Sequence, residues 1–469
     1  MSILKISGNN LIVGDKVTPR EDLFSREFLK YSDEQADNYY IDHYCVNEMF
    51  VYQVQKYLTL KFFIEQNDTI EEIEFDKPSL DLKFYAINIA KEKGLKVNGG
   101  GFWQEKKNKA QSLFLNFASF AFLFLKMIRI PKSNDEITVS DKFTVLRKRS
   151  KQSIQRFKKF DGIQKEIEDV YSKDSVYRLF PRSSRIGWVL RGYSQSIKDF
   201  RTISKFYGPK VGNGTVSLMY QWYAKRAVHT ALFSELLAHY MPFFKGKTYY
   251  TGSNLDRYSV VEEIIAAKND IKTVCIPHGL EYGYKFPKGF SCEFCYTTGE
   301  ETAKHLNRLY QTDKFKWDEE VAIKMFKLDG SKPHPQMVVF FTEPREVHVH
   351  YKIIEELAPM LKNIGVKLYL KLHPADNPHD YDGLHLDIIT DYNLSLTNNI
   401  CIARKSTTLL EAIYNGSKAI AIITNALDQN FFDTFPSLKT DIIIKTYSVI
   451  ELFEVIKSNM SSENNDEER

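Results

Sequence analysis

Two histidines with glycine or proline beside them directly follow short apolar stretches of the chain. His278 precedes Gly279, and His373 precedes Pro374. An imidazole can act as a general base near neutral pH or donate a hydrogen bond to a phosphate. Gly279 would let a ligand approach the backbone closely, because glycine has no side chain. A histidine at a strand end can also be purely structural, and both interpretations of His278 remain open at this point.

A third polar segment, 403–410, has the sequence ARKSTTLL. Here Ser406, Thr407 and Thr408 open a predicted helix. Backbone N–H groups and hydroxyls at a helix N-terminus attract anions, which favours a phosphate. An ordinary N-terminal cap explains Ser406 equally well.

Basic side chains follow the same predicted strands. Arg345 comes after the strand predicted over 336–342, where it can contact a donor phosphate or pair with a neighbouring glutamate. Lys371, Arg404 and Lys405 would favour an acidic ligand, although long basic side chains at strand ends are often only solvated.

Short β-branched runs alternate with helical patterns through the second half of the chain, as in a parallel, doubly wound sheet. The predicted strands cover 248–251, 272–277, 293–297, 336–342, 366–372, 399–403, 418–424 and 441–444. The predicted helices cover 257–268, 300–310, 351–362, 407–415 and 449–457. Open α/β sheets bind ligands beyond the carboxyl ends of their strands, so the polar segments described above are expected to lie in such crevices.

The domain organisation is predicted from changes in composition. The polar stretch 311–335 reads as a linker between an N-terminal domain over 1–325 and a C-terminal domain over 336–460. The N-terminal domain is expected to carry a helical insertion around 105–240. The acidic tail, 461–469, is expected to be disordered.

The N-terminal half is less regular. Segments 70–75, 82–93 and 95–97 predict a strand, a helix and a second strand. Residues 110–125 contain no charge and have lysines before and after them. A transmembrane span needs about 20 residues, so a helix that closes the core and a helix that dips into a membrane surface are both considered. The basic segment 145–159 is either a solvated helix face or a contact for anionic lipid.

Composition limits the class of protein. The chain has 469 residues with 64 Lys+Arg and 60 Asp+Glu, a net charge of +4. It should fold, and its charge alone does not make it a nucleic-acid binder. Five sparse cysteines and an N-terminus without a signal-peptide pattern favour a reducing cytoplasm. Cys292 and Cys295 have metal-ligand spacing without a second pair, and His348 and His350 are expected to be surface or packing residues.

The order of these segments resembles that of bacterial surface-polysaccharide glycosyltransferases of the GT-B type. Among these, the chain is similar to sialyl- and polysialyltransferases, capsule Kdo transferases and CDP-glycerol glycerophosphotransferases. In the sialyltransferases a His-Pro motif and a downstream Ser/Thr motif hold the cytidine monophosphate part of the donor, and His373-Pro374 and Ser406-Thr407 match these motifs. The resemblance covers roughly residues 245–460. It implies an α/β fold with two Rossmann-like domains that face a central cleft.

The resemblance also implies an activity. The expected enzyme is an inverting, metal-independent, sialyltransferase-like glycosyltransferase. It would transfer sialic acid or a related acidic sugar from a CMP-activated donor to a capsule or lipopolysaccharide glycan, or to a lipid-linked glycan, and would need no cofactor beyond that donor. The expected catalytic residues are His278 and His373. The expected donor-binding residues are His373, Pro374, Ser406, Thr407, Thr408, Arg345, Lys371 and Gly279.

The chain departs from this family in one respect. Sialyltransferases carry an acidic pair followed by glycine that supplies the general base, and no such sequence precedes residue 245; the nearest is Phe-Asp-Gly at 160–162. His278-Gly279 resembles the His-Gly segment of the glycerophosphotransferases, so His278 is the preferred base. Glycerol-phosphate or Kdo transfer is the alternative activity, and a non-catalytic polysaccharide-assembly scaffold is the alternative of another class. The expected location is the cytoplasm, with peripheral contact to the inner membrane.

Overall fold

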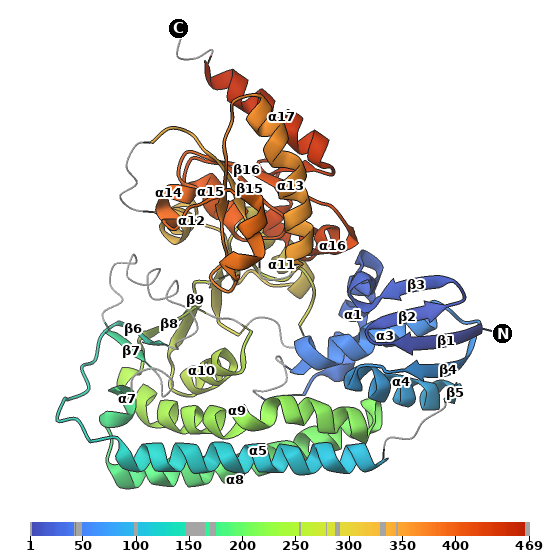
Figure 1. The fold of residues 1–469 in the computed structure, drawn as a ribbon. Helices are drawn as coiled ribbons and strands as arrows, with labels where there is room; N and C mark the ends of the chain where they lie inside the picture. The colour runs from blue at the N-terminus through green and yellow to red at the C-terminus, as the bar shows by residue number, and fades with distance from the viewer. Residues whose placement is uncertain are drawn as a thin grey trace. The chain divides into compact units, whose positions relative to one another are not determined.

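The computed structural model describes residues 2–41, 43, 49–97, 102–146, 165–168, 175–252, 255–277, 279–286, 291–328, 334–343 and 346–464 (Figure 1). Contacts divide the chain into two compact units. The first consists of Met1–His278, Tyr284–Tyr296 and Asn307–Lys316, and the second of Gly279–Gly283, Thr297–Leu306 and Trp317–Arg469. The chain therefore alternates between the units several times before it stays in the second.

A mixed sheet begins the first unit, with strand order β3-β2-β1-β4-β5. Its strands are β1 (Ser2–Ser7), β2 (Asn10–Val13), β3 (Lys16–Pro19), β4 (Ile70–Asp76) and β5 (Lys96–Val97). The first three are antiparallel, and their two tight turns use Gly8 and Gly14 at φ of 58° and 59°. Strands β4 and β5 are parallel and are joined by α4 (Leu80–Lys93). This β4-α4-β5 unit confirms the strand, helix and strand predicted over 70–97.

A second sheet in the first unit has six parallel strands in the order β11-β10-β9-β8-β6-β7. The strands are β6 (Lys142–Leu146), β7 (Lys165–Glu168), β8 (Thr248–Thr251), β9 (Lys272–Cys275), β10 (Phe294–Tyr296) and β11 (Phe315–Lys316). Helices α10 (Arg257–Lys268) and α11 (Glu300–Tyr310) connect β8 to β9 and β10 to β11. The strand order is that of a doubly wound, Rossmann-like sheet.

Three long helices lie side by side in the first unit (Figure 1). They are α5 (Phe102–Arg129), α8 (Arg182–Val211) and α9 (Asn213–Tyr240). Buried side chains such as Trp188 of α8 and Leu232 of α9 form one core with Phe143 and Tyr249 of the parallel sheet. Shorter helices of this unit are α1 (Arg26–Gln35), α3 (Gln55–Glu65) and α7 (Ser175–Arg178).

The second unit is built on a six-stranded, fully parallel sheet with the order β14-β13-β12-β15-β16-β17. The strands are β12 (Val338–Phe341), β13 (Leu368–Lys371), β14 (Asp387–Ile388), β15 (Ile400–Ala403), β16 (Lys418–Ile422) and β17 (Ile444–Thr446). In chain order this is 3-2-1-4-5-6, the order of the Rossmann fold. Every residue of β12 and β15 is buried, which explains their uninterrupted apolar sequences.

Helices cover both faces of this sheet. On one face, Val338 and Phe340 pack with α13 (Val347–Asn363) and α17 (Val449–Asn464). On the other face, Val339 pairs with side chains of α15 (Thr408–Tyr414) and α16 (Ala426–Thr434) in a separate core. Two short helices complete the unit, α12 (Glu319–Phe326) and α14 (Tyr392–Leu396).

The α/β class with two Rossmann-like sheets is confirmed by these strand orders. One local expectation is wrong. The predicted linker contains β11 and α12, because Asp318 caps α12 by accepting from the Val321 N–H and the helix buries Phe326. Helix α17 continues to Asn464, and residues 465–469 of the predicted tail lie outside the described residues, so the disorder of the tail stays a prediction.

Candidate functional site

The strand order of the second unit's sheet reverses between β12 and β15, which is where open α/β sheets bind ligands. Beyond β12 the chain continues into Thr342 and Glu343. Beyond β15 it continues into Arg404 and Lys405. Strand β13 pairs with β12 and is followed by His373. The structure therefore brings the ends of three strands that carry predicted site residues to one edge.

His373 is exposed at this edge, and its backbone is fixed by two hydrogen bonds. The His373 N–H donates to Thr342 Oγ1 and to Asp376 Oδ2, both at 3.1 Å. The Thr342 hydroxyl also donates to Asp376, which ties the end of β12 to the turn after β13. The ring Nδ1 of His373 accepts from the Ala375 N–H at 3.1 Å. A neutral imidazole with Nδ1 as acceptor carries its proton on Nε2, so His373 presents a donor. Pro374 beside it is exposed as well.

The cations at the end of β15 are already paired. The Arg404 side chain is completely buried, and its Nη2 lies 2.7 Å from Asp428 Oδ1 and 3.2 Å from Glu346 Oε2. Lys405 Nζ lies 2.5 Å from Glu346 Oε2 and 3.4 Å from Glu343 Oε1. Three carboxylates thus surround two cations. Both cations are therefore compensated by carboxylates of the protein, as a buried guanidinium requires. Their attraction for an acidic donor stays a prediction.

Glu346 connects these groups and begins α13. Its φ of 56° is left-handed. Burial by itself raises the pKa of the Glu346 carboxyl, but the hydrogen bond from Lys405 and the charge of Arg404 outweigh it, so the pKa lies below its usual range. Its carboxylate therefore stays ionised and holds the two cations in place.

His348 and His350 lie on α13, which begins four residues before the helix predicted over 351–362. His350 is buried, as a packing histidine should be, and its Nε2 lies 3.5 Å from Glu343 Oε1. On the other side of its ring, Nδ1 lies 3.5 Å from the Tyr381 hydroxyl. This histidine completes the polar cluster under the edge of the sheet.

The hydroxyl segment bonds within its own turn. Ser406 Oγ accepts from the Thr408 N–H at 3.1 Å and lies 2.8 Å from the Thr408 hydroxyl. Ser406 thus bonds within the turn that precedes α15. The N-cap of α15 is Thr407, whose side chain makes no capping hydrogen bond and whose carbonyl accepts from the N–H of Leu410 at 3.0 Å. Lys371 donates from Nζ to the Thr390 carbonyl at 2.5 Å, and burial lowers its pKa. A phosphate role for these residues remains a prediction.

Two predicted site residues, His278 and Arg345, lie outside the described residues. Gly279 is described, and a Cβ there would have no atom within 4 Å, so the space around it does not require glycine. Glu281, two residues after Gly279, is a buried acidic residue that was not among the predicted site residues. Its buried carboxylate accepts from the N–H and hydroxyl of Thr298 at 2.9 and 2.5 Å. The only sequence feature that could have marked Glu281 is its position directly after His-Gly-Leu.

Other residues of the site also escaped the sequence analysis. Thr342 and Asp376 are far apart in sequence and meet only because β12 and β13 are neighbours. Asp428 on α16 reaches Arg404 across the end of β16 and also accepts from the Thr424 N–H at 2.9 Å. No local motif marks such residues, because their function in the site depends on strand order.

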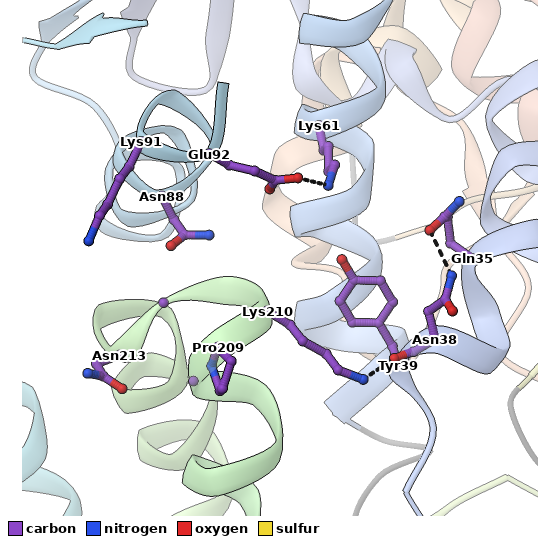
Figure 2. A pocket seen from close by; sticks show the side chains of 12 residues that line it. Gln35, Asn38, Tyr39, Lys61, Asn88, Lys91, Glu92, Pro209, Lys210 and Asn213 are labelled. Atoms are coloured by element: carbon purple, nitrogen blue, oxygen red, sulfur yellow. Dashed lines mark hydrogen bonds and ion pairs between the residues drawn. The ribbon is translucent and has the colours of Figure 1, made fainter. Parts of the chain in front are cut away.

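The first unit contains a separate polar cavity of about 810 Å³ (Figure 2). It lies between the end of α1, helices α3 and α4, and the turn from α8 to α9. Its lining residues are Gln35, Asn38, Tyr39, Lys61, Asn88, Lys91, Glu92, Gly208, Pro209, Lys210, Gly212 and Asn213. This volume is within the usual range for small-molecule sites, about 300–1,000 Å³.

The cavity wall combines fixed amides with lysines. Lys61 Nζ lies 2.5 Å from Glu92 Oε1, and Figure 2 marks this ion pair with a dashed line. Lys210 donates to the Asn38 carbonyl, and burial lowers its pKa. Gly212 has a φ of 77°, and a Cβ there would lie 2.4 Å from the Asn88 side-chain oxygen. The lining contains three lysines (Lys61, Lys91 and Lys210) and one glutamate (Glu92), so its charge suits an anionic ligand.

The sulfur-containing segment gives no metal site. Cys292 and Cys295 are buried free thiols beside Cys275 of β9. In the described ranges, no group of three His, Cys, Asp or Glu residues has a geometry that could hold a metal ion.

The chain was compared with known proteins. Its sequence matches no protein-family model and no curated protein. Among solved structures it is similar to the E. coli heptosyltransferase WaaC with ADP, at 10% identity and a TM-score of 0.34, over 68% of this chain and 99% of the other. Values this low establish no relation in family or activity.

Proposed function

We propose that this protein is a glycosyltransferase that uses a nucleotide-activated sugar. The observation that supports this most is the position of His373. It follows the strand next to the switch point of a 3-2-1-4-5-6 parallel sheet, the place where such sheets bind nucleotides. The first unit has a second Rossmann-like sheet, as expected if one sheet binds the sugar donor and the other belongs to the part that binds the acceptor.

We further propose a CMP-activated acidic sugar as the donor. In this proposal, the Nε2–H of His373 donates to the phosphate that bridges the nucleotide and the sugar. Pro374 fixes the turn that presents the ring, because proline restricts its own φ. Thr407 and Thr408 lie half-buried beyond the neighbouring strand β15, and their hydroxyls are our candidates for further contacts to the same donor. Arg345 and Lys371 are the proposed further phosphate contacts.

The chemistry is a single displacement. The acceptor hydroxyl attacks the anomeric carbon, a new carbon–oxygen bond forms, and the bond from that carbon to the phosphate oxygen breaks. The electron pair leaves with the nucleotide phosphate, whose growing charge the His373 hydrogen bond stabilises. A general base takes the hydroxyl proton, and His278 is our candidate for it. The configuration at the anomeric carbon is inverted.

The polar cavity of the first unit is our candidate for the acceptor glycan. Sugar hydroxyls need many short hydrogen-bonding partners, which the side chains of Asn88, Asn213 and Gln35 supply. Lys91 and Lys210 would bind an acidic or phosphorylated sugar unit. Surface polysaccharides that carry acidic sugars fit this combination of amides and cations.

Thermal-shift titration with CMP, CDP, UDP, GDP and ADP tests the proposal. A ligand at about 100 times its dissociation constant stabilises the folded protein by about 2.7 kcal/mol. The shift should disappear in His373→Ala. His379→Ala is the matched control, because His379 is exposed on the nearby turn (Pro378–Leu384), where its Nδ1 lies 2.9 Å from Asp382.

The outcomes separate the alternatives. A shift with CMP that only His373→Ala removes, followed by transfer from a CMP-sugar detected by mass spectrometry, supports the full proposal. A shift with UDP, GDP or ADP keeps the transferase and overturns the CMP donor. Turnover of CDP-glycerol would replace it with glycerophosphate transfer. No shift with any nucleotide would overturn the enzyme and favour a scaffold.

A further inference from the structure

Helix α5 has an inverted distribution of polar and apolar side chains. The side that faces the bundle carries Asn108, Ser112 and Asn116, which are at most 1% exposed. The opposite side carries an apolar stripe, which we call the α5 stripe. Its members are Leu113 (41% exposed), Phe114 (67%), Phe117 (53%), Phe122 (65%) and Leu125 (51%). A helix on the surface of a protein surrounded by water normally has the reverse pattern.

Specific contacts hold α5 in this orientation. The Asn116 amide nitrogen lies 2.9 Å from Ser196 Oγ of α8 and 3.2 Å from the Tyr220 hydroxyl of α9. Leu123 and Met127 are buried in the core of the same bundle. Rotating the helix to hide the phenylalanines would break this buried network and expose both apolar side chains. The stripe is therefore a stable feature of the folded surface.

Cations flank the stripe. Lys106, Lys107 and Lys109 are exposed near one end of α5, and Arg129 is exposed at the other. Helix α8 packs beside α5 and exposes further cations, namely Lys198, Arg201 and Lys205. The single acidic residue of α8, Asp199, has a fully buried side chain that lies 2.9 Å from His43. Glu105 of α5 is half-buried, so the exposed charged side chains of α5 and α8 are basic.

We propose that the α5 stripe docks into the surface of a membrane that contains anionic lipids. Phenylalanine and leucine side chains would enter the boundary between headgroups and acyl chains, while the lysines bind the lipid phosphates. The bilayer is a better partner than a second copy of the chain. Both ends of the stripe are basic, so pairing two stripes in either direction would bring like charges together.

The helix lies on the membrane and does not cross it. Glu105–Arg129 is long and apolar enough to span a bilayer by length and composition. To do so it would have to leave α8 and α9 and place Asn108, Ser112 and Asn116 in hydrocarbon, where unpaired amides are costly. This inference is independent of the proposed glycosyl transfer, because it depends only on the bundle of the first unit.

Vesicle flotation of the full chain tests the proposal. The probes are vesicles of phosphatidylcholine alone and of phosphatidylcholine mixed with phosphatidylglycerol. Wild type should float with the anionic vesicles, and Phe114→Ser/Phe117→Ser/Phe122→Ser should lower its partition coefficient at least about tenfold, since each lost aromatic side chain removes apolar burial. Phe243→Ser is the matched control, because Phe243 is 51% exposed but lies outside α5. Its binding should equal that of wild type.

Two further measurements keep the outcome clear if the triple variant folds poorly. Phe114→Trp should show a blue shift of its fluorescence when anionic vesicles are added. Lys106→Glu/Lys107→Glu/Lys109→Glu should lose preference for anionic over neutral vesicles. Equal flotation of wild type and the triple serine variant would overturn the proposal. A dimer in solution that the triple serine variant abolishes would also overturn it. Resistance of the bound protein to alkaline extraction would overturn the location of the helix on the membrane surface.

Discussion

The guanidinium of Arg404 and the carboxylate of Asp428 form a completely buried ion pair, with Nη2 2.7 Å from Oδ1. A second contact joins Arg404 Nε to Asp428 Oδ2 at 3.2 Å. The pair links the end of β15 to α16 and lies directly under the switch point of the sheet. Its charges are satisfied within the protein, so its role is to fix the strand ends that carry the exposed site residues.

Removing one member of this pair should be strongly destabilising. Asp428→Asn would leave the buried Arg404 charge without its main partner, and such losses cost about 3–5 kcal/mol. Urea unfolding measures the difference. Lys367→Ala is the control, because Lys367 forms an exposed pair with Asp387, with side chains 59% and 64% exposed. A similar loss of stability in both variants would contradict the structural role given to Asp428.

Asp33 should make the stability of the protein depend on mildly acidic pH. Burial raises the pKa of its carboxyl to about 6, although the Lys285 N–H donates to it at 2.5 Å. Between its ordinary pKa and about 6, the folded state then holds more protons than the unfolded state. Stability should therefore fall as the pH rises through this window.

Asp33→Asn should flatten that part of the profile, as measured by urea unfolding at a series of pH values. Asp37→Asn is the control, since Asp37 is an exposed carboxylate that pairs with the Nζ of the same Lys285 at 2.9 Å. An unchanged slope in Asp33→Asn would mean that another group is responsible.

Gly212 should tolerate alanine less well than another glycine at positive φ. At Gly212 the new methyl group would lie 2.4 Å from Asn88 Oδ1, in addition to the strain of a φ of 77°. Gly246 has a φ of 74°, but a Cβ there would meet no atom within 4 Å. We expect Gly246→Ala to cost about 1 kcal/mol and Gly212→Ala about 2 kcal/mol or more. Equal melting temperatures for the two variants would contradict the close approach.

Lys91 should contribute to acceptor binding if the polar cavity holds an acidic glycan. Lys91→Ala should raise the KM for the acceptor about fivefold, corresponding to about 1 kcal/mol, and leave nucleotide binding unchanged. Lys93→Ala is the control on the same helix, because Lys93 pairs with Glu65 at 3.2 Å and does not line the cavity. A rise in the nucleotide dissociation constant instead would place Lys91 at a different step.

The sequence predicted those elements whose stability is local. Helices α10 and α11 match their predicted bounds. Asp256 caps α10 by accepting from the Ser259 N–H, and the apolar residues of α11 recur on one helical face. The β1–β3 meander was not predicted. The sequence does carry its signals, because Leu4 and Ile6 alternate with less buried residues in β1, and Gly8 and Gly14 mark the two turns. Strand β17 begins at Ile444, at the end of the run predicted over 441–444, because pairing with β16 decides its register.

The candidate site was predictable only in part. His373 could be selected because it directly follows a recognisable strand. The pairing of Arg404 with Asp428 and Glu346 could not be predicted, since it depends on which strands become neighbours. For the same reason, the sequence suggested that Arg404 and Lys405 are unpaired cations, whereas the structure pairs both with carboxylates.

The division of the chain into units has a consequence for how the protein is made. Segments Gly279–Gly283 and Thr297–Leu306 belong to the second unit, yet the ribosome produces them before β11 of the first unit. The first unit therefore lacks a strand of its sheet while parts of the second have already emerged. A fragment that starts at residue 317 would also lack both segments. No single truncation point yields either unit intact. We therefore expect the two units to complete their folding together, while the last third of the chain is synthesised.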